Sequence, residues 1–321
     1  MMTMTMMRHF SVPLMAMTLS WTASTARAME SSNTTDATGR AILYIQDRLF
    51  SGAPSPVDLL LFGCLMLIAF EGLNLVTKHT QRWIPTDLIQ VRGKHLDELG
   101  QVDRIFIGLN KLSTPPFAYL YLRFALRNSA IPVHVGDASL LNTLGPLPVM
   151  FIVYDLFYTV LHGVLHIPSI YSHIHKHHHH QKAPSRANVD AVNVHPLEFF
   201  LGEYNHLLAL YLVSQYIMPV HVIAALLFLV IGALLTGWNH TRFDVAFLGI
   251  YDSKAHDVHH RIPQSNYGQY SMFWDHVFGT FRSYDASDRV NPRAQLDPLT
   301  GKSLEHVERI AGGGSSTKKE S

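Results

Sequence analysis

The sequence has few charged residues and one cysteine, and both shortages limit what the protein can be. Charged residues make up 15% of the 321 residues and hydrophobic residues 48%, a balance that favours a membrane protein. The 25 basic and 24 acidic residues leave a formal net charge of +1, which argues against a nucleic-acid-binding surface. Because Cys64 is the single cysteine, a disulfide framework and a thiolate metal cluster are excluded. Any bound metal must rely on nitrogen and oxygen ligands.

Residues 1–29 have the composition of a targeting segment. They combine Arg8, an apolar stretch over 10–21 and an A-x-A sequence over 26–28, and they contain no acidic residue. This pattern is typical of a secretory signal more than of a plastid or mitochondrial transit peptide, so we exclude it from the fold.

Composition divides the remaining chain into a membrane region over 30–145, a histidine-rich region over 146–285 and a polar tail over 286–321. In the first region, 57–76 is apolar apart from Asp58 at its start and Glu71, and it is long enough to span a bilayer. The segment 105–126 is apolar but contains Lys, Arg and two prolines. It could span the membrane, lie at its interface or pack inside the protein.

The stretch from 204 to 241 contains no Asp, Glu, Lys or Arg. One helix crosses a bilayer with about 20 residues, so this stretch fits two helices with a reversal near Met218 and Pro219, where proline interrupts helical hydrogen bonding. The hairpin would return the chain to the membrane face that it left. The alternative is one long kinked helix, which would place the flanking histidines on opposite faces. With the apolar segment 147–165, we expect four or five spans.

Among the 21 histidines, three groups have the spacing of one helical face. Residues at i, i+3 and i+4 share a face of an α-helix, so each group should direct its imidazoles at one point. The groups are His162 and His166; His175, His178 and His179; and His256, His259 and His260. His195 and His240 are candidate additional ligands. Eight to ten imidazoles exceed the needs of one tetrahedral zinc and suit two metal ions.

Imidazole ligands indicate a first-row transition metal rather than Ca²⁺ or Mg²⁺. We favour iron over zinc, because a redox metal beside an apolar membrane interior has lipid C–H bonds within reach. Asp155 interrupts the apolar segment 147–165 and lies seven residues before His162 on the same helical face. We predict it as a catalytic-site residue that accepts a hydrogen bond from a ligating histidine, with Asp257 and Asp275 as further candidates for that role.

Other interpretations of the histidines stay open. The dense run over 173–180 could be a loop that binds metal loosely through composition alone, although a second triplet in ordinary sequence favours a defined site. A metal transporter or metal-storage protein would also contain histidines and apolar spans. It would need ligands within the spans, and the stretch 204–241 offers only His206, His221 and His240. A membrane scaffold without activity is a third interpretation.

These residues, in this order, resemble the fatty acid hydroxylase / sterol desaturase superfamily of integral membrane di-iron enzymes. The resemblance extends over about 150–281 through the motifs YDLFYTVLHGVLH, HIHKHHHHQKAP, HPLEF, NHTRFD and HDVHHRIPQSNYGQYSMFWDHVFGTF. It identifies the three histidine groups with the three histidine boxes of the superfamily and adds His195 and His240. It also implies that 146–285 is the catalytic domain of an all-α membrane helical bundle, with a cytosolic helical cap that carries a histidine-rich di-metal site.

The resemblance implies an enzyme with two iron ions on the cytosolic face of the endoplasmic reticulum that uses O₂ to oxidise a membrane lipid. The chain has no His-Pro-Gly-Gly motif of cytochrome b5 and no dinucleotide fingerprint. The electron donor is therefore expected to be cytochrome b5 with its NAD(P)H-dependent reductase. We expect hydroxylation of a sterol or sterol precursor ahead of a fatty acyl or sphingoid lipid, with desaturation as the alternative. Lys318 and Lys319 match a dilysine retrieval signal for the same membrane.

Overall fold

The structure is a computed structural model that describes residues 44–50, 52, 54–92 and 94–284. The targeting segment predicted for 1–29 and the tail predicted for 286–321 lie outside these residues. The long helices are α3 (Pro56–Lys78), α4 (Gln101–Arg127), α6 (Pro146–Leu165), α9 (Pro196–Leu212) and α10 (Val222–Asn239). The short helices are η1 (Gln46–Phe50), η2 (Thr80–Arg82), η3 (Val135–Asp137), α5 (Leu140–Thr143), α7 (Pro168–Tyr171), η4 (His175–His180), α8 (Asn188–Ala191), η5 (Val213–Ile217), α11 (Ser253–Arg261) and α12 (Phe273–Phe278).

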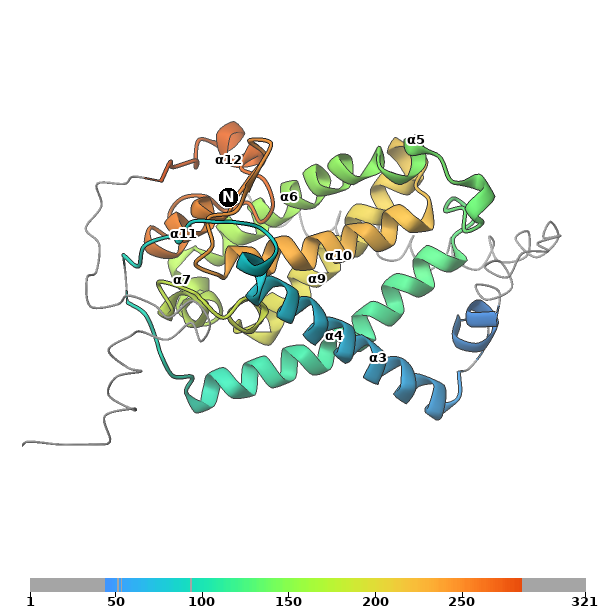
Figure 1. Cartoon of the computed structure of the whole chain (residues 1–321), viewed down its shortest axis with the longest axis horizontal. Helices are drawn as coiled ribbons and strands as arrows, with labels where there is room; N and C mark the ends of the chain where they lie inside the picture. The colour runs from blue at the N-terminus through green and yellow to red at the C-terminus, as the bar shows by residue number, and fades with distance from the viewer. Residues whose placement is uncertain (1–43, 51, 53, 93, 285–321) are drawn as a thin grey trace, which may run out of the picture.

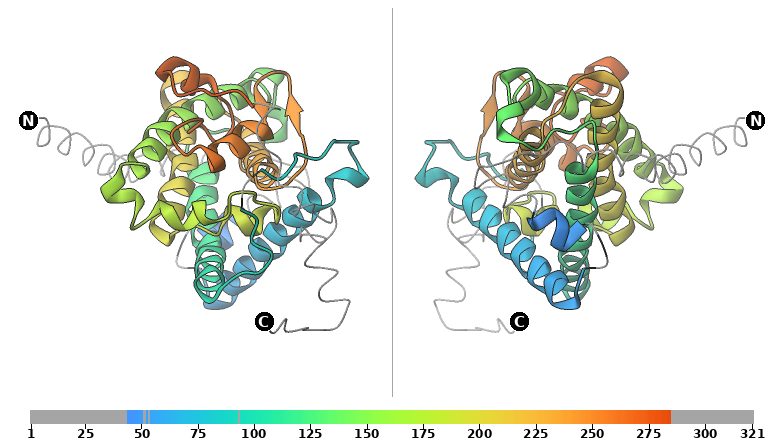
Figure 2. Two further views of the ribbon diagram at one scale, coloured as in Figure 1. Left: turned by 90° about the vertical axis from the view of Figure 1, so that its left-hand side faces the viewer. Right: turned by 90° about the vertical axis from the view of Figure 1, so that its right-hand side faces the viewer.

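The long helices form a bundle, and the short helices gather mainly at its two ends. Helices α4, α6, α9 and α10 extend along the length of the molecule, and α3 crosses them obliquely (Figure 1). Helices α7, α11 and α12 lie together at one end, whereas α5 lies at the other (Figure 1). The end view in Figure 2 shows the segments from α11 and α12 in front of the bundle. The predicted helical membrane bundle is confirmed, and its cap is the end that contains α7, α11 and α12.

Sequence signals at the helix ends explain where several helices begin. Ser55 precedes α3, and its side chain accepts a hydrogen bond from the Asp58 amide, while Pro56 occupies the first helical position. Asp252 caps α11 by accepting from the Lys254 amide at 2.9 Å. His221 caps α10 by accepting from the Ile223 amide at 3.2 Å. These caps satisfy amide groups that have no partner within their own helix.

The segment 105–126, which the sequence leaves undecided, lies within one continuous helix. Helix α4 includes Pro115 and Pro116 in its interior. Ser113 and Thr114 side chains donate to the carbonyl of Asn110, a contact that hydroxyl side chains commonly form with the preceding turn of a helix. The face of α4 that includes Tyr121 is buried, and the Tyr121 hydroxyl donates to the Ala225 carbonyl of α10 at 2.9 Å.

The predicted hairpin within 204–241 is confirmed. Helix α9 continues into the π-helix η5, and the chain then reverses over 218–221 before α10 begins. Both helices pack on α6. The start of α9 and the end of α10 both contact the histidine-rich cap, so the chain returns to the end of the molecule that it left. The alternative of one kinked helix is therefore wrong.

Among the described residues, three helical segments are long and apolar enough to cross a membrane: 56–78, 140–165 and 222–239. This is fewer than the four or five spans expected. Helix α4 includes Asp103, Arg104, Lys111 and two further arginines, which lower its apolar character. Helix α9 alone has 17 residues, short of the roughly 20 that a span needs, although η5 extends it as far as Ile217. The sheet within the described residues is one antiparallel pair, β1 (Ala246–Phe247) and β2 (Tyr251–Asp252).

Candidate metal centre

Five histidines from four segments converge at the cap end of the bundle. This five-histidine cluster consists of His162, His166, His175, His179 and His259, and the five ring nitrogens that could bind a metal all lie within 4.8 Å of one another. The Nε2 atoms of His162 and His179 both lie 3.0 Å from Nε2 of His175. Nε2 of His259 lies 3.1 Å from Nε2 of His179. The ring nitrogens that converge here thus come from α6, the segment after it, η4 and α11.

A second group lies beside the first. This four-histidine cluster consists of His178, His240, His256 and His260, all buried. Nε2 of His240 lies 3.4 Å from that of His178 and 3.1 Å from that of His256, which in turn lies 3.1 Å from that of His260. The two clusters together contain nine of the ten histidines predicted as ligands.

Each histidine triplet is divided between the clusters, which corrects the expectation that a triplet points at one metal. In η4, His175 and His179 enter the five-histidine cluster and His178 enters the four-histidine cluster. In α11 the division is the reverse, because His256 and His260 join the four-histidine cluster. The triplet pattern identifies a face, but that face is wide enough to border two sites. Residues at i and i+4 stay together, and the residue at i+3 contacts the other site.

The outer nitrogens of these imidazoles face acceptors. A carbonyl or carboxylate accepts from Nδ1 of five clustered histidines: Tyr267 O from His162 at 2.8 Å, Glu198 Oε1 from His175 at 2.7 Å, Thr236 O from His240 at 2.8 Å, Ser265 O from His259 at 2.7 Å and Gln181 O from His260 at 3.0 Å. A backbone carbonyl cannot donate, so the nitrogen that faces it must carry the proton. The Nε2 lone pairs of these rings therefore point inward, as metal ligands do.

The inward lone pairs fit a metal and are unfavourable without one. Nδ1 is protonated in both His162 and His175, so their Nε2 atoms, 3.0 Å apart, meet lone pair to lone pair. Burial, followed by the charges of neighbouring imidazoles, lowers the pKa of His259 and His260 well below its ordinary value, which keeps these rings neutral. His166 is half-buried, and its buried Nε2 atom has no hydrogen-bond partner among the described residues. Metal–nitrogen bonds of about 2.0–2.1 Å would place ligand atoms roughly 3 Å apart, as they are in both clusters.

Asp155 does not bond to a histidine, which corrects its predicted role. Its fully buried carboxylate accepts from the amides of Gln269 and Tyr270, both at 3.1 Å, and from the Ser271 amide at 2.6 Å. The Ser271 hydroxyl adds a fourth hydrogen bond at 2.9 Å. Asp155 thus holds one side of the loop over 265–271, and the side chain is fully occupied by that loop.

Asp275 holds the other side of the same loop, and it too does not contact a histidine. Its carboxylate accepts from the amides of Tyr267 at 2.7 Å and Gly268 at 2.8 Å. A Cβ at Gly268 would lie 2.3 Å from the Ser271 carbonyl oxygen, so this tight loop requires glycine. Since the Tyr267 and Ser265 carbonyls accept from His162 and His259, the loop orients two members of the five-histidine cluster.

Two other predicted residues have structural contacts instead. Nδ1 of His195 accepts from the Leu197 amide at 3.2 Å and caps α9, outside both clusters. The sequence His195-Pro196 explains why His195 lies at the N-terminus of α9, because proline favours the first helical turn. Asp257 forms ion pairs with Arg242 at 2.6 Å and with Arg261 at 3.1 Å, so it does not orient a histidine.

The remaining histidines of the dense run form a third, smaller group. Nε2 of His177 and of His180 both lie 3.1 Å from the Asp103 carboxylate. Asn193 and the Gly100 amide donate to the same carboxylate at 2.8 Å and 2.7 Å. These contacts connect η4 to the start of α4. His173 is exposed to solvent.

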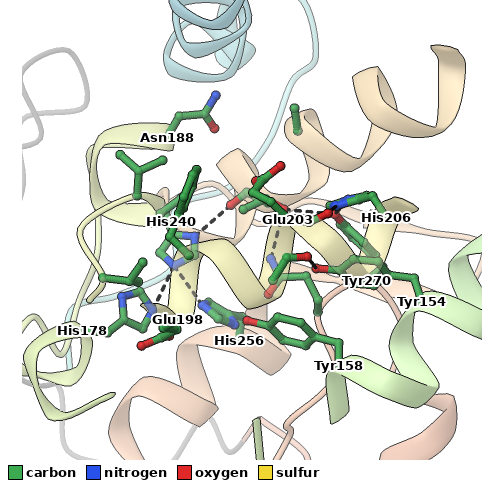
Figure 3. A pocket seen from close by; sticks show the side chains of 18 of the residues that line it. Tyr154, Tyr158, His178, Asn188, Glu198, Glu203, His206, His240, His256 and Tyr270 are labelled. Atoms are coloured by element: carbon green, nitrogen blue, oxygen red, sulfur yellow. Dashed lines mark hydrogen bonds between the residues drawn. The ribbon is translucent and has the colours of Figure 1, made fainter. Parts of the chain in front are cut away.

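A cavity of about 130 Å³ borders the four-histidine cluster and extends between α3, α6, α9 and α10 (Figure 3). Its walls include His178, His240 and His256 from that cluster and no histidine of the five-histidine cluster. Tyr154 and Tyr158 line the side formed by α6 (Figure 3). A lipid atom in this space would therefore meet the four-histidine cluster first.

The sequence did not predict that Glu198, Gln181 and the loop over 265–271 would accept hydrogen bonds from the clustered histidines. Glu198 is buried at the start of α9, where its Oε1 accepts from His175. An acidic residue three positions after His195, ahead of an apolar helix, was a usable signal for it. The Gln181 and Ser265 contacts go through backbone carbonyls, which every residue type has, so the sequence contains no signal for them.

Comparison with known proteins identifies the same region. Residues 147–280 match the family model described as fatty acid hydroxylase. Lathosterol oxidase from Rattus norvegicus is 27% identical over 185 residues, which cover 52% of this chain and 58% of that protein. A fatty acid hydroxylase from Mycosarcoma maydis is 33% identical over 168 residues, covering 48% of this chain and 40% of that protein. Methylsterol monooxygenase 1 from Rattus norvegicus is 29% identical over 141 residues, covering 42% and 46%.

The chain thus spans about half the length of the curated relatives that it matches. No solved structure matches it significantly. The matched region contains all nine clustered histidines and the loop that orients two of them. This region is therefore similar to the fatty acid hydroxylase / sterol desaturase superfamily.

Proposed function

We propose that this protein is a membrane-bound di-iron oxidoreductase that uses O₂ and externally supplied electrons to hydroxylate a lipid. The observation that carries the proposal is the pair of buried imidazole clusters, one of which borders a largely apolar cavity within the helix bundle. A metal transporter would need a path of ligands through the bundle. Here the ligands are gathered at one end, which supports a catalytic centre instead.

Each cluster can hold one transition-metal ion through neutral imidazoles. Iron in both sites would supply the redox chemistry that the oxidation of an unactivated lipid C–H bond requires. The protein's own contribution is to fix the rings: the Glu198 carboxylate and the carbonyls of Tyr267 and Ser265 determine which nitrogen of each bound ring is free. The largely apolar surface of the cavity would limit the water around the reacting lipid carbon.

A sterol or sterol precursor is the favoured substrate class, ahead of fatty acyl and sphingoid lipids. Two of the relatives named above act, by their names, on sterols, and one on fatty acids. Desaturation is the alternative outcome of the same chemistry, and a relative from Nicotiana tabacum is a Delta(7)-sterol-C5(6)-desaturase. The position of the lipid carbon relative to the four-histidine cluster would decide between them.

We further propose that the protein resides in the endoplasmic reticulum membrane with the histidine clusters on the cytosolic face. Cytochrome b5 and its NAD(P)H-dependent reductase would then supply the electrons. This arrangement is supported by the position of both clusters at one end of the bundle, where α6 and α10 end and where the electron donor could approach.

The test is product analysis of membranes that contain the full chain, supplied with NADH, ¹⁸O₂ and a panel of sterols, fatty acids and sphingoid bases. We expect a lipid that gains one ¹⁸O atom, and two irons per chain in the purified protein. A lipid that loses two hydrogens without gaining oxygen would show a desaturase instead.

His259→Ala is the inactive comparison, and His173→Ala is its matched control in exposed sequence. Identical lipid profiles from wild type and His259→Ala across the panel would overturn the proposal. Binding of zinc alone, with no lipid product, would also overturn it and would favour metal storage.

A further inference from the structure

The cavity beside the four-histidine cluster contains an acidic residue that neither the metal ligands nor the fold requires. Glu198 and Glu203, both on α9, line the cavity (Figure 3), and no lysine or arginine lines it. Glu198 is engaged by His175 through Oε1. Glu203 differs from Glu198, because the Glu203 carboxylate forms no hydrogen bond or ion pair with any described residue.

The side chain of His206, one turn after Glu203 on α9, is already satisfied. Nδ1 of His206 faces the backbone carbonyl of Glu203 at 3.3 Å and so carries the proton. Its Nε2 must then accept from the Tyr270 hydroxyl, 2.8 Å away. This pair is tightly enclosed, since a Cβ at Gly232 would lie 2.8 Å from the Tyr270 hydroxyl. Neither His206 nor Tyr270 has a proton left to donate to Glu203.

Glu203 is half-buried. An acidic group that has no donor from the protein at a largely apolar cavity is unfavourable, and such groups in membrane proteins are functional sites by default. Pockets that recognise small molecules are mainly apolar and contain few polar groups, which set the orientation of the ligand. Glu203 has this position, with Phe70, Leu229 and Ala233 among the apolar residues of the same cavity. A hydroxyl group on a bound ligand would supply the hydrogen-bond donor that the carboxylate of Glu203 lacks.

We propose that Glu203 is the specificity-determining residue of the lipid cavity, where it accepts a hydrogen bond from a hydroxyl group of the lipid and excludes lipids that end in a carboxylate. This inference rests on the proposed lipid-oxidising function. Glu203 follows Glu198 by five residues on α9, roughly 8 Å along the helix axis. The hydroxyl thus lies several bonds from the carbon that meets the metals.

The size of the cavity restricts how the lipid binds. A volume of about 130 Å³ is below the roughly 300–1,000 Å³ of a pocket that encloses a whole drug-sized ligand. The cavity therefore receives the hydroxyl-bearing end of the lipid, and the remainder of the lipid stays outside it. A carboxylate at that end would meet two acidic side chains and no cation.

The test is equilibrium binding to the purified full-length chain in detergent, with two probe pairs that differ in one hydroxyl: cholestanol with cholestane, and octadecan-1-ol with octadecane. In wild type we expect at least one of the two alcohols to bind about 10- to 100-fold more tightly than the matching hydrocarbon. This ratio is the range expected for a hydrogen bond to a charged group. Glu203→Leu should abolish that preference. Glu203→Gln should reduce it and should improve binding of octadecanoate.

Glu71→Leu is the matched control, because Glu71 lies on another apolar helix and pairs with Lys111 outside the cavity. Unchanged metal content and gel-filtration profile establish that each variant is folded, and Glu203→Gln decides the matter if Glu203→Leu fails to fold. An alcohol preference that is absent from wild type, or equal in wild type and both Glu203 variants, would overturn the inference.

Failure of the inference is distinguishable from failure of the proposed function. The binding assay needs no turnover, so a lost preference in Glu203→Leu stands whether or not the protein oxidises a lipid. Where turnover is observed, Glu203→Leu should raise KM for the lipid alcohol far more than it lowers kcat. Oxidised product from wild type, together with no effect of either Glu203 variant on binding or KM, would refute the role of Glu203 alone.

Discussion

The two histidine clusters have similar ligands but different surroundings. In the five-histidine cluster, one ring bonds to a carboxylate, His175 to Glu198, and two bond to the loop over 265–271. In the four-histidine cluster, the ring partners identified are the backbone carbonyls of Thr236 and Gln181. Only the four-histidine cluster borders the cavity. The comparison indicates that the first cluster is the more rigidly supported and the second lies nearer the substrate.

The largest effect should come from removing a ligand from either cluster. We expect His259→Ala and His260→Ala each to reduce lipid oxidation by more than about 100-fold, beyond the 10- to 100-fold typical of lost supporting contacts. Each variant should also retain about half of the wild-type metal, measured by elemental analysis of the purified protein. Loss of all metal from both variants would show that the clusters do not act as separate sites.

Asp155→Ala should have the next largest effect, and it should act on stability. The change leaves the buried amides of Gln269, Tyr270 and Ser271 without their acceptor, at a cost of about 1–3 kcal/mol for each group. We expect a clear fall in the thermal unfolding temperature of the detergent-purified protein. Unchanged unfolding with lost activity would restore the catalytic role first predicted for this residue.

Substitution of Glu198 should weaken metal binding at one cluster and not at the other. Because its carboxylate supports His175 alone, Glu198→Ala should weaken metal binding at the five-histidine cluster by about 10- to 100-fold and leave the other cluster occupied. Glu198→Gln, which keeps an acceptor oxygen, should have a smaller effect. Chelator titration followed by elemental analysis measures both. Equal weakening of the two metals would contradict the separate support of the clusters.

His195→Ala should have the smallest effect. The residue caps α9 and lies outside both clusters, so the change should cost about 0.5–2 kcal/mol of stability and leave the metal content unchanged. A loss of one metal ion would show that His195 is a ligand after all, as the sequence predicted.

The apolar patterns and the histidine spacing predicted much of this structure. The spans over 57–76 and 147–165 follow from long apolar stretches, and the hairpin within 204–241 follows from an uncharged stretch with a proline at the reversal. Eight of the nine clustered histidines follow from helical spacing, because imidazoles at that spacing share a helix face, and His240 was predicted as an additional ligand. The wrong details depend on contacts between segments: Asp155 was assigned to a histidine on its own helix, whereas its partners lie more than a hundred residues away.

The sequence by itself determined that the protein is helical, apolar and rich in imidazole ligands, since these properties depend on composition and on spacing along single helices. The tertiary structure decided which histidines share a metal site, because the packing of η4 against α11 divides each triplet between two clusters. It also decided that Glu198 orients a ligand while Glu203 faces the cavity without a partner. Both residues lie on one helix, and only the segments that pack against α9 distinguish them.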